Sequence, residues 1–290
     1  MTHPTSLENA LAQARSLLFV PGNRPERFAK ALASGADAVV LDLEDSVPLS
    51  AKQAAREAIH DAWPDLRAAG VPLVVRINAT DSPSGIQDGE WLASAMSASP
   101  PTALMIPKAN TRASLEHLAG RLPGAALLPI IETAAGYAAL PEIAAATGVL
   151  RLAVGHIDFL ADTGLQCSAD ESELAPLRFA VAMATRLHGL APAFDGVTVA
   201  IDDEARLRED TCRALRFGFG GKLCIHPRQV AVVHAAMTPS AEELTWARRV
   251  IAADAASGGA AVQLDGRMVD APVVLQARRT LARLRGSEPA

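Results

Sequence analysis

Short runs of branched apolar residues alternate with longer alanine-rich stretches along most of this chain. The apolar runs predict strands at residues 16–20, 38–43, 73–77, 103–106, 126–131, 152–154, 191–198 and 222–225. Stretches of helical period predict helices at residues 24–34, 50–69, 88–98, 111–120, 137–147, 172–188, 203–217 and 227–236. Repeated strand–helix units form parallel sheets covered by helices. Eight such units in succession predict an α/β fold of the TIM (β/α)8 barrel type.

One segment interrupts this pattern. Residues 81–91, DSPSGIQDGEW, are polar and contain proline and glycine, so a long loop is expected there. Because that loop breaks the third unit, a doubly wound open sheet remains the alternative architecture.

The pattern changes again after residue 237. A helix is expected over 240–256, a hairpin over AVQLDGRMVD, and a last helix over 271–285. So short a segment cannot bury a core of its own. We therefore expect a catalytic barrel domain over residues 1–237 and a C-terminal helical arm or lid over 238–290, packed on the barrel or on a neighbouring subunit.

Composition excludes several classes of protein. The chain has 290 residues, half of them hydrophobic, and a net charge of -5 with no basic face suited to a nucleic-acid backbone. Its cysteines, Cys167, Cys212 and Cys224, are odd in number and lack metal-binding spacing, which favours free thiols in a reducing compartment. No stretch approaches the ~20 apolar residues that span a bilayer, and no signal peptide is evident. A cytoplasmic protein without nucleic-acid or membrane partners is expected.

Polar residues interrupt the apolar runs where the predicted strands end. In a TIM barrel the active site is built at these carboxyl ends. The candidates, in strand order, are Asp42, Glu44, Asp45, Arg76, Asn78, Lys108, Glu132, His156, Asp158 and His226.

The acidic cluster after the second strand needs a cation nearby, and Arg76 on the adjacent strand is the natural partner. Two interpretations stand. The cluster is either a structural ion-pair network, or Glu44 and Asp45 orient Arg76 so that its planar fork grips a substrate carboxylate or carbonyl oxygen.

Glu132 and Asp158 end consecutive strands, so their carboxylates are expected to converge. Two oxygen ligands with room for water and substrate suit Mg²⁺, although either carboxylate is also suited to capping the following helix. The chain lacks a set of Cys and His residues with the spacing of a structural zinc site.

His156 and His226 are candidates for proton transfer or for structural hydrogen bonding. FVPGNRPERF is suited to holding a phosphate near Arg24 or Arg27.

Six segments together resemble the citrate lyase beta-subunit-like and malyl-CoA lyase family of the HpcH/HpaI aldolase superfamily. They are RSLLFVPGNRPERFAKALASGADAVVLDLEDSV, VVRIN, PIIET, VGHIDF, GKLCIHPRQ and the late GRMVDAPV, and the first of them carries LFVPGNRPERF and LDLEDSV in tandem. The resemblance covers nearly the whole chain. It implies that Glu132 and Asp158 bind Mg²⁺ and that Arg76 contacts a keto acid.

The resemblance carries further expectations. Pro21, Asn23 and Lys108 are expected to contact the substrate together with Arg76 and Glu132. Members of the family assemble as trimers or hexamers in which the arm of one subunit covers the next active site. Asp270 in the arm matches an aspartate that serves there as acid and base.

The expected activity is therefore that of a Mg²⁺-dependent carbon–carbon lyase or aldolase. It would cleave or form a 3-hydroxyacyl thioester, such as a malyl-CoA- or citramalyl-CoA-like compound, and release a 2-keto acid. An acyl-CoA thioesterase and a non-catalytic CoA-binding subunit are the alternatives. Many members of the family carry a small residue and then Glu where this chain has His156 and Ile157, so citrate lyase activity itself is not assumed.

Overall fold

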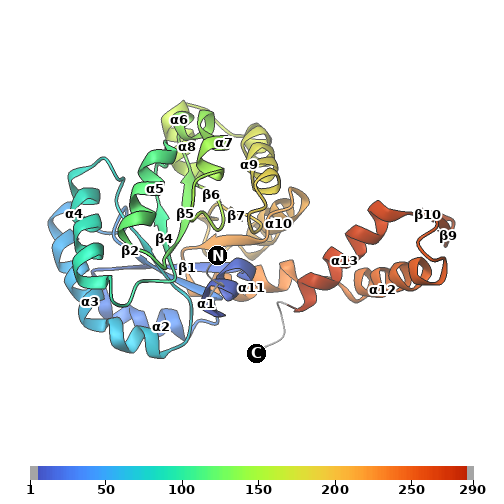
Figure 1. Ribbon diagram of the computed structural model, residues 1–290, viewed down its shortest axis with the longest axis horizontal. Helices are drawn as coiled ribbons and strands as arrows, with labels where there is room; N and C mark the ends of the chain where they lie inside the picture. The colour runs from blue at the N-terminus through green and yellow to red at the C-terminus, as the bar shows by residue number, and fades with distance from the viewer. Residues whose placement is uncertain (1–5, 286–290) are drawn as a thin grey trace. The chain divides into compact units, whose positions relative to one another are not determined.

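The computed structural model describes residues 6–285 and contains a closed barrel of eight parallel strands in chain order (Figure 1). The strands are β1 Ser16–Pro21, β2 Ala38–Asp42, β3 Leu73–Arg76, β4 Ala103–Ile106, β5 Ala126–Ile131, β6 Ala153–Val154, β7 Phe194–Asp195 and β8 Gly221–Cys224. Pairing of β1 with both β2 and β8 closes the ring. The predicted TIM barrel is confirmed, and the open-sheet alternative is wrong.

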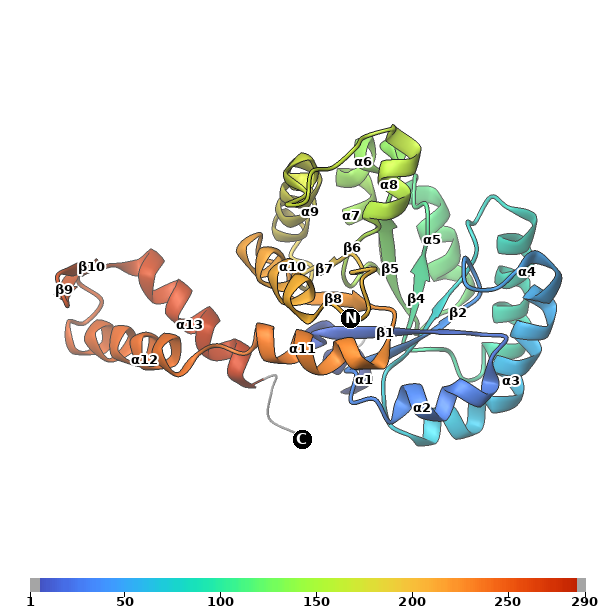
Figure 2. The same cartoon turned by 180° about the vertical axis from the view of Figure 1, so that it is seen from behind.

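Helices surround the barrel, as the opposite views of Figures 1 and 2 show. They are α1 Ser6–Gln13, α2 Phe28–Leu32, α3 Lys52–Ala68, α4 Pro83–Trp91, α5 Arg112–Arg121, α6 Ala134–Ala138, α7 Leu140–Ala144, α8 His156–Thr163, α9 Ala175–Leu187, α10 Glu204–Arg216 and α11 Pro227–Met237. Among the described residues, no helix has both the length and the apolar character needed to cross a membrane.

Two segments between strands differ from their predicted structure. Most of the expected loop at 81–91 is helix α4, because the Ser82 side chain accepts a hydrogen bond from the Gly85 N–H and Pro83 occupies the first turn. The expected helix at 137–147 is instead the two short helices α6 and α7. Pro141 stands in the first turn of α7, where its missing N–H is tolerated, but it cannot continue α6.

A buried arginine closes the amino-terminal end of the barrel. Arg151 is 0% exposed and donates from Nε to the Pro192 carbonyl (2.6 Å) and from Nη1 to the Leu11 (2.9 Å) and Ala14 (2.7 Å) carbonyls. Its guanidinium also lies 3.5 Å from the ring centroid of Phe194. One side chain thus ties α1 to the segments that lead into β6 and β7.

Arg151→Met is expected to lower the free energy of unfolding by about 3 kcal/mol, because it removes the side-chain donor from the Pro192 and Ala14 carbonyls. Urea denaturation measures the change. The exposed Arg186 of α9 offers a matched control, since Arg186→Met should shift stability by less than about 0.5 kcal/mol. Equal stability of the two variants would show that the Arg151 hydrogen bonds contribute no net stabilisation.

The chain divides into two compact units, residues 1–233 and 234–290. The sequence-based boundary after residue 237 coincides with the end of α11, whereas this division lies inside that helix. In the described part of the second unit, α12 Ala241–Ala256 packs on α13 Ala271–Arg285. Strand β9 Val262–Leu264 pairs with β10 Arg267–Val269 through the turn residues Asp265 and Gly266, whose φ angles are 50° and 76°. The predicted hairpin is confirmed.

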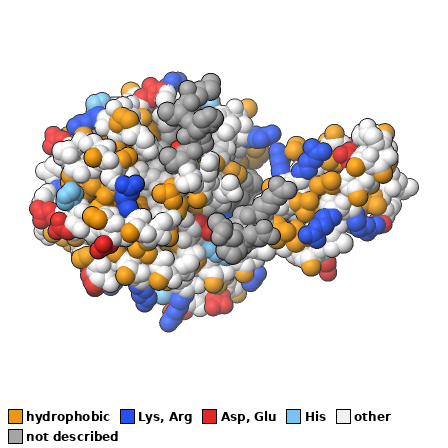
Figure 3. Space-filling model, turned by 60° about the horizontal axis from the view of Figure 1, so that its bottom comes forward, with side chains coloured by type: hydrophobic (Ala, Val, Ile, Leu, Met, Phe, Trp, Pro, Cys, Tyr) orange, Lys and Arg blue, Asp and Glu red, His pale blue; other side chains and the backbone are white. Residues whose placement is uncertain are grey.

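Charged side chains of both signs are scattered over the face of the barrel unit drawn in Figure 3. On that face no continuous basic surface is seen among the described residues. A nucleic-acid backbone would need such a surface.

Candidate active site

Arg76 ends β3 directly beside Asp42, which ends β2, because the two residues are partners in the strand register. The guanidinium grips the Asp42 carboxylate two-pronged, with Nε–Oδ1 at 2.6 Å and Nη2–Oδ2 at 2.8 Å. Asp42 is 0% exposed. Burial acts to raise the pKa of Asp42, but the hydrogen bonds and charge of Arg76 lower it below its usual value.

This contact differs from the expected one. The sequence suggested that Glu44 and Asp45 orient Arg76, leaving its fork for the substrate. Instead, Asp42 accepts the hydrogen bonds of Nε and Nη2. The remaining nitrogen, Nη1, lies 2.9 Å from Glu44 Oε2 and 3.4 Å from Asp45 Oδ2. Asp42 is among the candidates from the sequence, but the role of holding Arg76 was assigned to Glu44 and Asp45 instead. The signal was available, because a charged last residue of one strand faces the arginine that ends the next.

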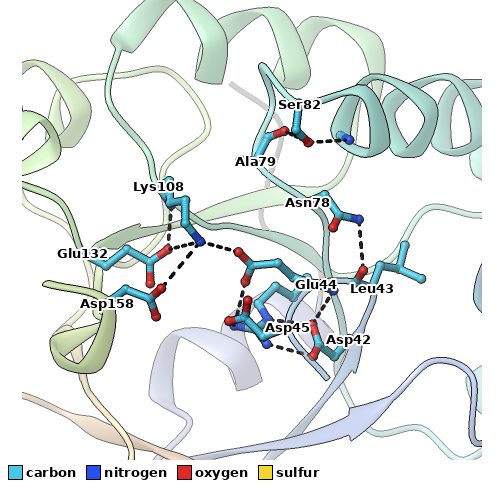
Figure 4. A network of polar contacts seen from close by, with 12 residues as sticks. Asp42, Leu43, Glu44, Asp45, Asn78, Ala79, Ser82, Lys108, Glu132 and Asp158 are labelled. Carbon is cyan, nitrogen blue, oxygen red and sulfur yellow. Dashed lines mark hydrogen bonds and ion pairs between the residues drawn. The ribbon is translucent and has the colours of Figure 1, made fainter. Parts of the chain in front are cut away.

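Three carboxylates surround the ammonium group of Lys108, which follows β4. Lys108 Nζ lies 2.7 Å from Glu44 Oε1, 3.9 Å from Glu132 Oε1 and 3.7 Å from Asp158 Oδ1. Figure 4 shows these carboxylates, from three different parts of the barrel, pointing toward the same place. The backbone N–H of Lys108 also donates to Glu132 Oε1 (2.7 Å). The structure thus brings together the expected residues Arg76, Glu44, Asp45, Lys108, Glu132 and Asp158.

The environment of Glu132 disfavours its negative charge, and the positive charge of Lys108 does not fully offset this effect. The residue is 3% exposed, and burial together with the negative charges of Glu44 and Asp158 raises the pKa of Glu132 to about 8. A divalent cation between Glu132 and Asp158 would relieve this repulsion. The described residues contain no group of three or more His, Cys, Asp or Glu side chains that could hold a metal. Two carboxylates completed by water or substrate oxygens nevertheless fit Mg²⁺.

Gly155, at the end of β6, makes room for the Glu132 carboxylate. A Cβ atom at Gly155 would lie 2.2 Å from Glu132 Oε2 and 2.6 Å from Glu132 Cβ. No side chain fits at that distance without moving the carboxylate. The glycine is therefore required by the site rather than by the strand.

Gly155→Ala is expected to weaken Mg²⁺ binding by about 10-fold or more, since displaced ligand carboxylates lose their alignment. Titration calorimetry with Mg²⁺ alone measures the affinity. Gly120→Ala is the matched control, because nothing lies within 4 Å of a Cβ at Gly120 in α5. Unchanged affinity in Gly155→Ala would contradict the assignment of Glu132 as a ligand.

A cavity of about 740 Å³ opens over these residues at the carboxyl ends of the strands. Pro21 lines it as expected, together with Arg76, Glu132 and Asp158. Arg27 and Lys30 line the same cavity and are exposed. Neither side chain makes an ion pair with another described residue, so both positive charges are available to a ligand in the cavity.

Other candidates have surroundings of their own. Asn23 is not among the described residues that line it, and its Oδ1 is buried without a hydrogen-bond partner among them. Arg24 pairs with Glu26 at 2.5 Å. Asp270 belongs to the second unit and directly precedes α13, where its carboxylate accepts a hydrogen bond from the Val273 N–H (3.4 Å).

Both candidate histidines line the cavity. His226 Nδ1 accepts a hydrogen bond from the Arg228 N–H (3.2 Å). His156, the first residue of α8, is 6% exposed, and burial lowers the pKa of its imidazole. His156 and Asp158 both lie in the first turn of α8.

Known proteins are similar to this chain in sequence and in architecture. The family described as HpcH/HpaI aldolase/citrate lyase matches residues 15–227. A citrate lyase subunit beta-like protein of Mycobacterium tuberculosis strain H37Rv is 38% identical over 280 residues, covering 95% of this chain and 97% of that protein. A (3S)-malyl-CoA thioesterase of Cereibacter sphaeroides strain ATCC 17029 is 33% identical over 272 residues, covering 93% and 94% of the two chains.

Solved structures agree with these relatives. The crystal structure of CitE from Mycobacterium tuberculosis in complex with magnesium, acetoacetate and coenzyme A matches with a TM-score of 0.82 and 37% sequence identity. The match covers 94% of this chain and 99% of that one.

Proposed function

The chain belongs to the HpcH/HpaI aldolase/citrate lyase family, a family of lyases, and we propose that it is a Mg²⁺-dependent carbon–carbon lyase acting on 3-hydroxyacyl thioesters. It would cleave or form a malyl-CoA- or citramalyl-CoA-like compound and release a 2-keto acid. The observation that carries the proposal is that Arg76, Glu132 and Asp158 line one cavity, where Glu132 and Asp158 converge near Lys108 (Figure 4).

Glu132 and Asp158 are the residues that would hold the metal. When bound, Mg²⁺ supplies Lewis-acid stabilisation to the oxygens of the keto-acid portion of the substrate. The magnesium in the structure of the Mycobacterium tuberculosis CitE supports this choice.

Arg76 stabilises the same oxygens through Nη1. Because Asp42 holds Nε and Nη2, the guanidinium is fixed before the substrate arrives, and a preorganised donor costs no reorganisation during the reaction. Glu44 and Asp45 share Nη1 and complete its orientation. Lys108 neutralises Glu44 and holds Glu132 through its backbone N–H.

A coenzyme A thioester is the proposed form of the substrate. Arg27 and Lys30 offer two unpaired cations at the cavity, and cations of this kind bind phosphate groups. Pro21, which ends β1 and lines the cavity, is proposed to contact the substrate as well. The coenzyme A bound in the structure of the Mycobacterium tuberculosis CitE supports a coenzyme A thioester as the substrate.

Turnover of a thioester panel tests the proposal. Malyl-CoA, citramalyl-CoA and citryl-CoA are incubated with the protein, and the released 2-keto acid is quantified with Mg²⁺, with a chelator, and with Mg²⁺ restored. We expect keto acid from at least one thioester, lost with the chelator and recovered with the metal. No keto acid from any of the three would contradict the proposal.

Thioester hydrolysis is the second candidate function. It is favoured by the likeness to the (3S)-malyl-CoA thioesterase. Water would then take the place of the keto acid at the same site. A non-catalytic CoA-binding subunit is less favoured, because Arg76, Glu132 and Asp158 are all present and held in one place.

Asp270 is proposed as the proton carrier, supplied by the arm of a neighbouring subunit in a homotrimer or hexamer. Glu132→Ala and Asp270→Asn should each be inactive, and Asn preserves the cap of α13. Dissociated, mixed equally and reassembled, they should regain about a quarter of wild-type activity, since about one interface in four pairs two intact residues. Continued inactivity of mixtures shown by mass spectrometry to be hetero-oligomers would place Asp270 at its own barrel or outside catalysis.

A further inference from the structure

One wall of the cavity is lined mainly by apolar side chains. Where β6, β7 and β8 end, its lining side chains include Val154, Ile157, Val197, Leu223 and Ile225. Of the described residues that line this wall, those with polar side chains are Asp158 and the two histidines discussed above. A hydrogen-bond donor on such a wall acts in a local dielectric lower than that of water, so its bond to a ligand is stronger.

His156 is turned so that one edge of its ring is available to a ligand. A Cβ atom at Gly196, which follows β7, would lie 2.2 Å from His156 Nδ1 and 2.9 Å from Cε1. The Nδ1–Cε1 edge therefore packs on the bare backbone of Gly196. Nδ1 is enclosed without a hydrogen-bond partner among the described residues. Because His156 lines the cavity, the opposite edge with Nε2 is the one that can serve a ligand.

Buried charges hold the backbone beneath this ring. Lys222 Nζ donates to the Gly196 carbonyl (2.6 Å), and Arg178 Nε donates to Asp195 Oδ1 (3.1 Å). Arg178 also pairs with Glu171 at 2.6 Å. Lys222 and Arg178 are each 1% exposed, and Asp195 is 0% exposed. A side chain supported in this way keeps a fixed position, which a catalytic donor requires.

Within the proposed function, which this inference rests on, Arg76 and the metal carboxylates serve the keto-acid oxygens. The thioester carbonyl oxygen needs a separate donor. We propose that His156 is a catalytic residue that donates a hydrogen bond from Nε2 to that oxygen. The His156 imidazole thereby stabilises the enolate formed at the acyl group.

Cleavage begins at the 3-hydroxyl group of the thioester. The 3-hydroxyl gives its proton to a base, its oxygen forms the keto C=O bond, and the C2–C3 bond breaks. The electron pair of that bond passes to the thioester as an enolate whose charge rests on the oxygen bound by His156. The proton then returns to C2, giving the acyl thioester and the 2-keto acid.

Variants at position 156 separate donation from packing. His156→Leu removes the donor, whereas His156→Gln keeps an amide N–H near the place of Nε2. The double variant His156→Ala with Gly196→Ala removes the donor but puts a methyl group into the space the ring leaves. We expect kcat to fall about 100-fold in His156→Leu and in the double variant, with KM within about threefold and unchanged melting temperature. His156→Gln should stay within about 10-fold of wild type.

Activity of His156→Leu within threefold of wild type would overturn the proposal. So would a loss in His226→Leu as large as that in His156→Leu, because His226 is the rival donor on the same wall. A loss in His156→Gln equal to that in His156→Leu would show that the ring acts by packing alone.

Infrared spectroscopy provides a readout that needs no turnover. Acetyl-CoA with a ¹³C-labelled carbonyl is bound with Mg²⁺ to each variant, and binding is verified by calorimetry. We expect the carbonyl band to move to lower frequency in wild type and His156→Gln but not in His156→Leu. The same frequency in wild type and His156→Leu would overturn the assignment, as would failure of acetyl-CoA to bind. Absence of keto acid from every thioester, with the shift intact, would instead contradict only the lyase function.

Discussion

Glu132→Gln is expected to abolish Mg²⁺-dependent turnover, with a loss of at least about 100-fold, while the barrel stays folded. Magnesium competes with its full hydration shell only when anionic oxygens replace water, and a neutral amide oxygen at position 132 leaves Asp158 as the remaining anion of the pair. Release of 2-keto acid measures activity, and calorimetry with Mg²⁺ measures affinity. Both should fall together.

The fold should not suffer from this change. The raised pKa of Glu132 shows that its negative charge is disfavoured where it stands, so an uncharged side chain of the same shape should keep or raise the melting temperature. Glu142→Gln on α7 is the matched control, since that carboxylate is exposed. Wild-type turnover and Mg²⁺ affinity in Glu132→Gln would overturn the metal site.

Arg76→Lys is expected to lose nearly as much activity as Arg76→Ala, about 100-fold or more. An ammonium group keeps the positive charge beside Asp42, but it cannot hold Asp42 with two parallel bonds and present a third N–H in a fixed direction. Measuring kcat/KM and the free energy of unfolding in urea for each variant separates loss of activity from loss of stability. Arg76→Ala leaves the buried Asp42 carboxylate without its ion-pair partner and should lose about 3–5 kcal/mol of stability, whereas Arg76→Lys should lose less.

An exposed arginine gives the control for this series. Arg112 pairs with Glu116 on the surface of α5 at 2.8 Å, so Arg112→Lys should preserve both activity and stability. If Arg76→Lys keeps most of the activity, then Arg76 belongs to a structural ion-pair network, which is the other interpretation of its neighbours.

The barrel could be predicted because its signal is periodic. Each strand of a parallel barrel is buried on both faces, so the apolar runs stand out between amphipathic helices. Strand bounds are predicted less well where proline or glycine lies within an apolar run. The expected strand at 191–198 is only Phe194–Asp195 in the structure. Pro192 lacks a strand donor, and Gly196 packs against His156 instead of continuing the ladder.

The site could be predicted only in part. Charged residues at strand ends converge in any TIM barrel, which is why Glu132, Asp158 and Arg76 were identified together. The pairing of Arg76 with Asp42 depends on strand register, and the place of Lys108 Nζ among three carboxylates depends on side-chain conformation. Packing of Gly155 on Glu132 and of Gly196 on His156 joins residues far apart in the chain. Sequence spacing does not contain these contacts.

Cleavage of a carbon–carbon bond is tested most directly by measuring two products in one sample. The protein is incubated with Mg²⁺ and the thioester that it turns over best, and 2-keto acid and free thiol are quantified together. A lyase gives keto acid and acyl-CoA in equal amounts, with no more free thiol than Glu132→Gln produces. Free coenzyme A released in step with a hydroxy acid, without keto acid, would contradict the lyase and identify a thioesterase.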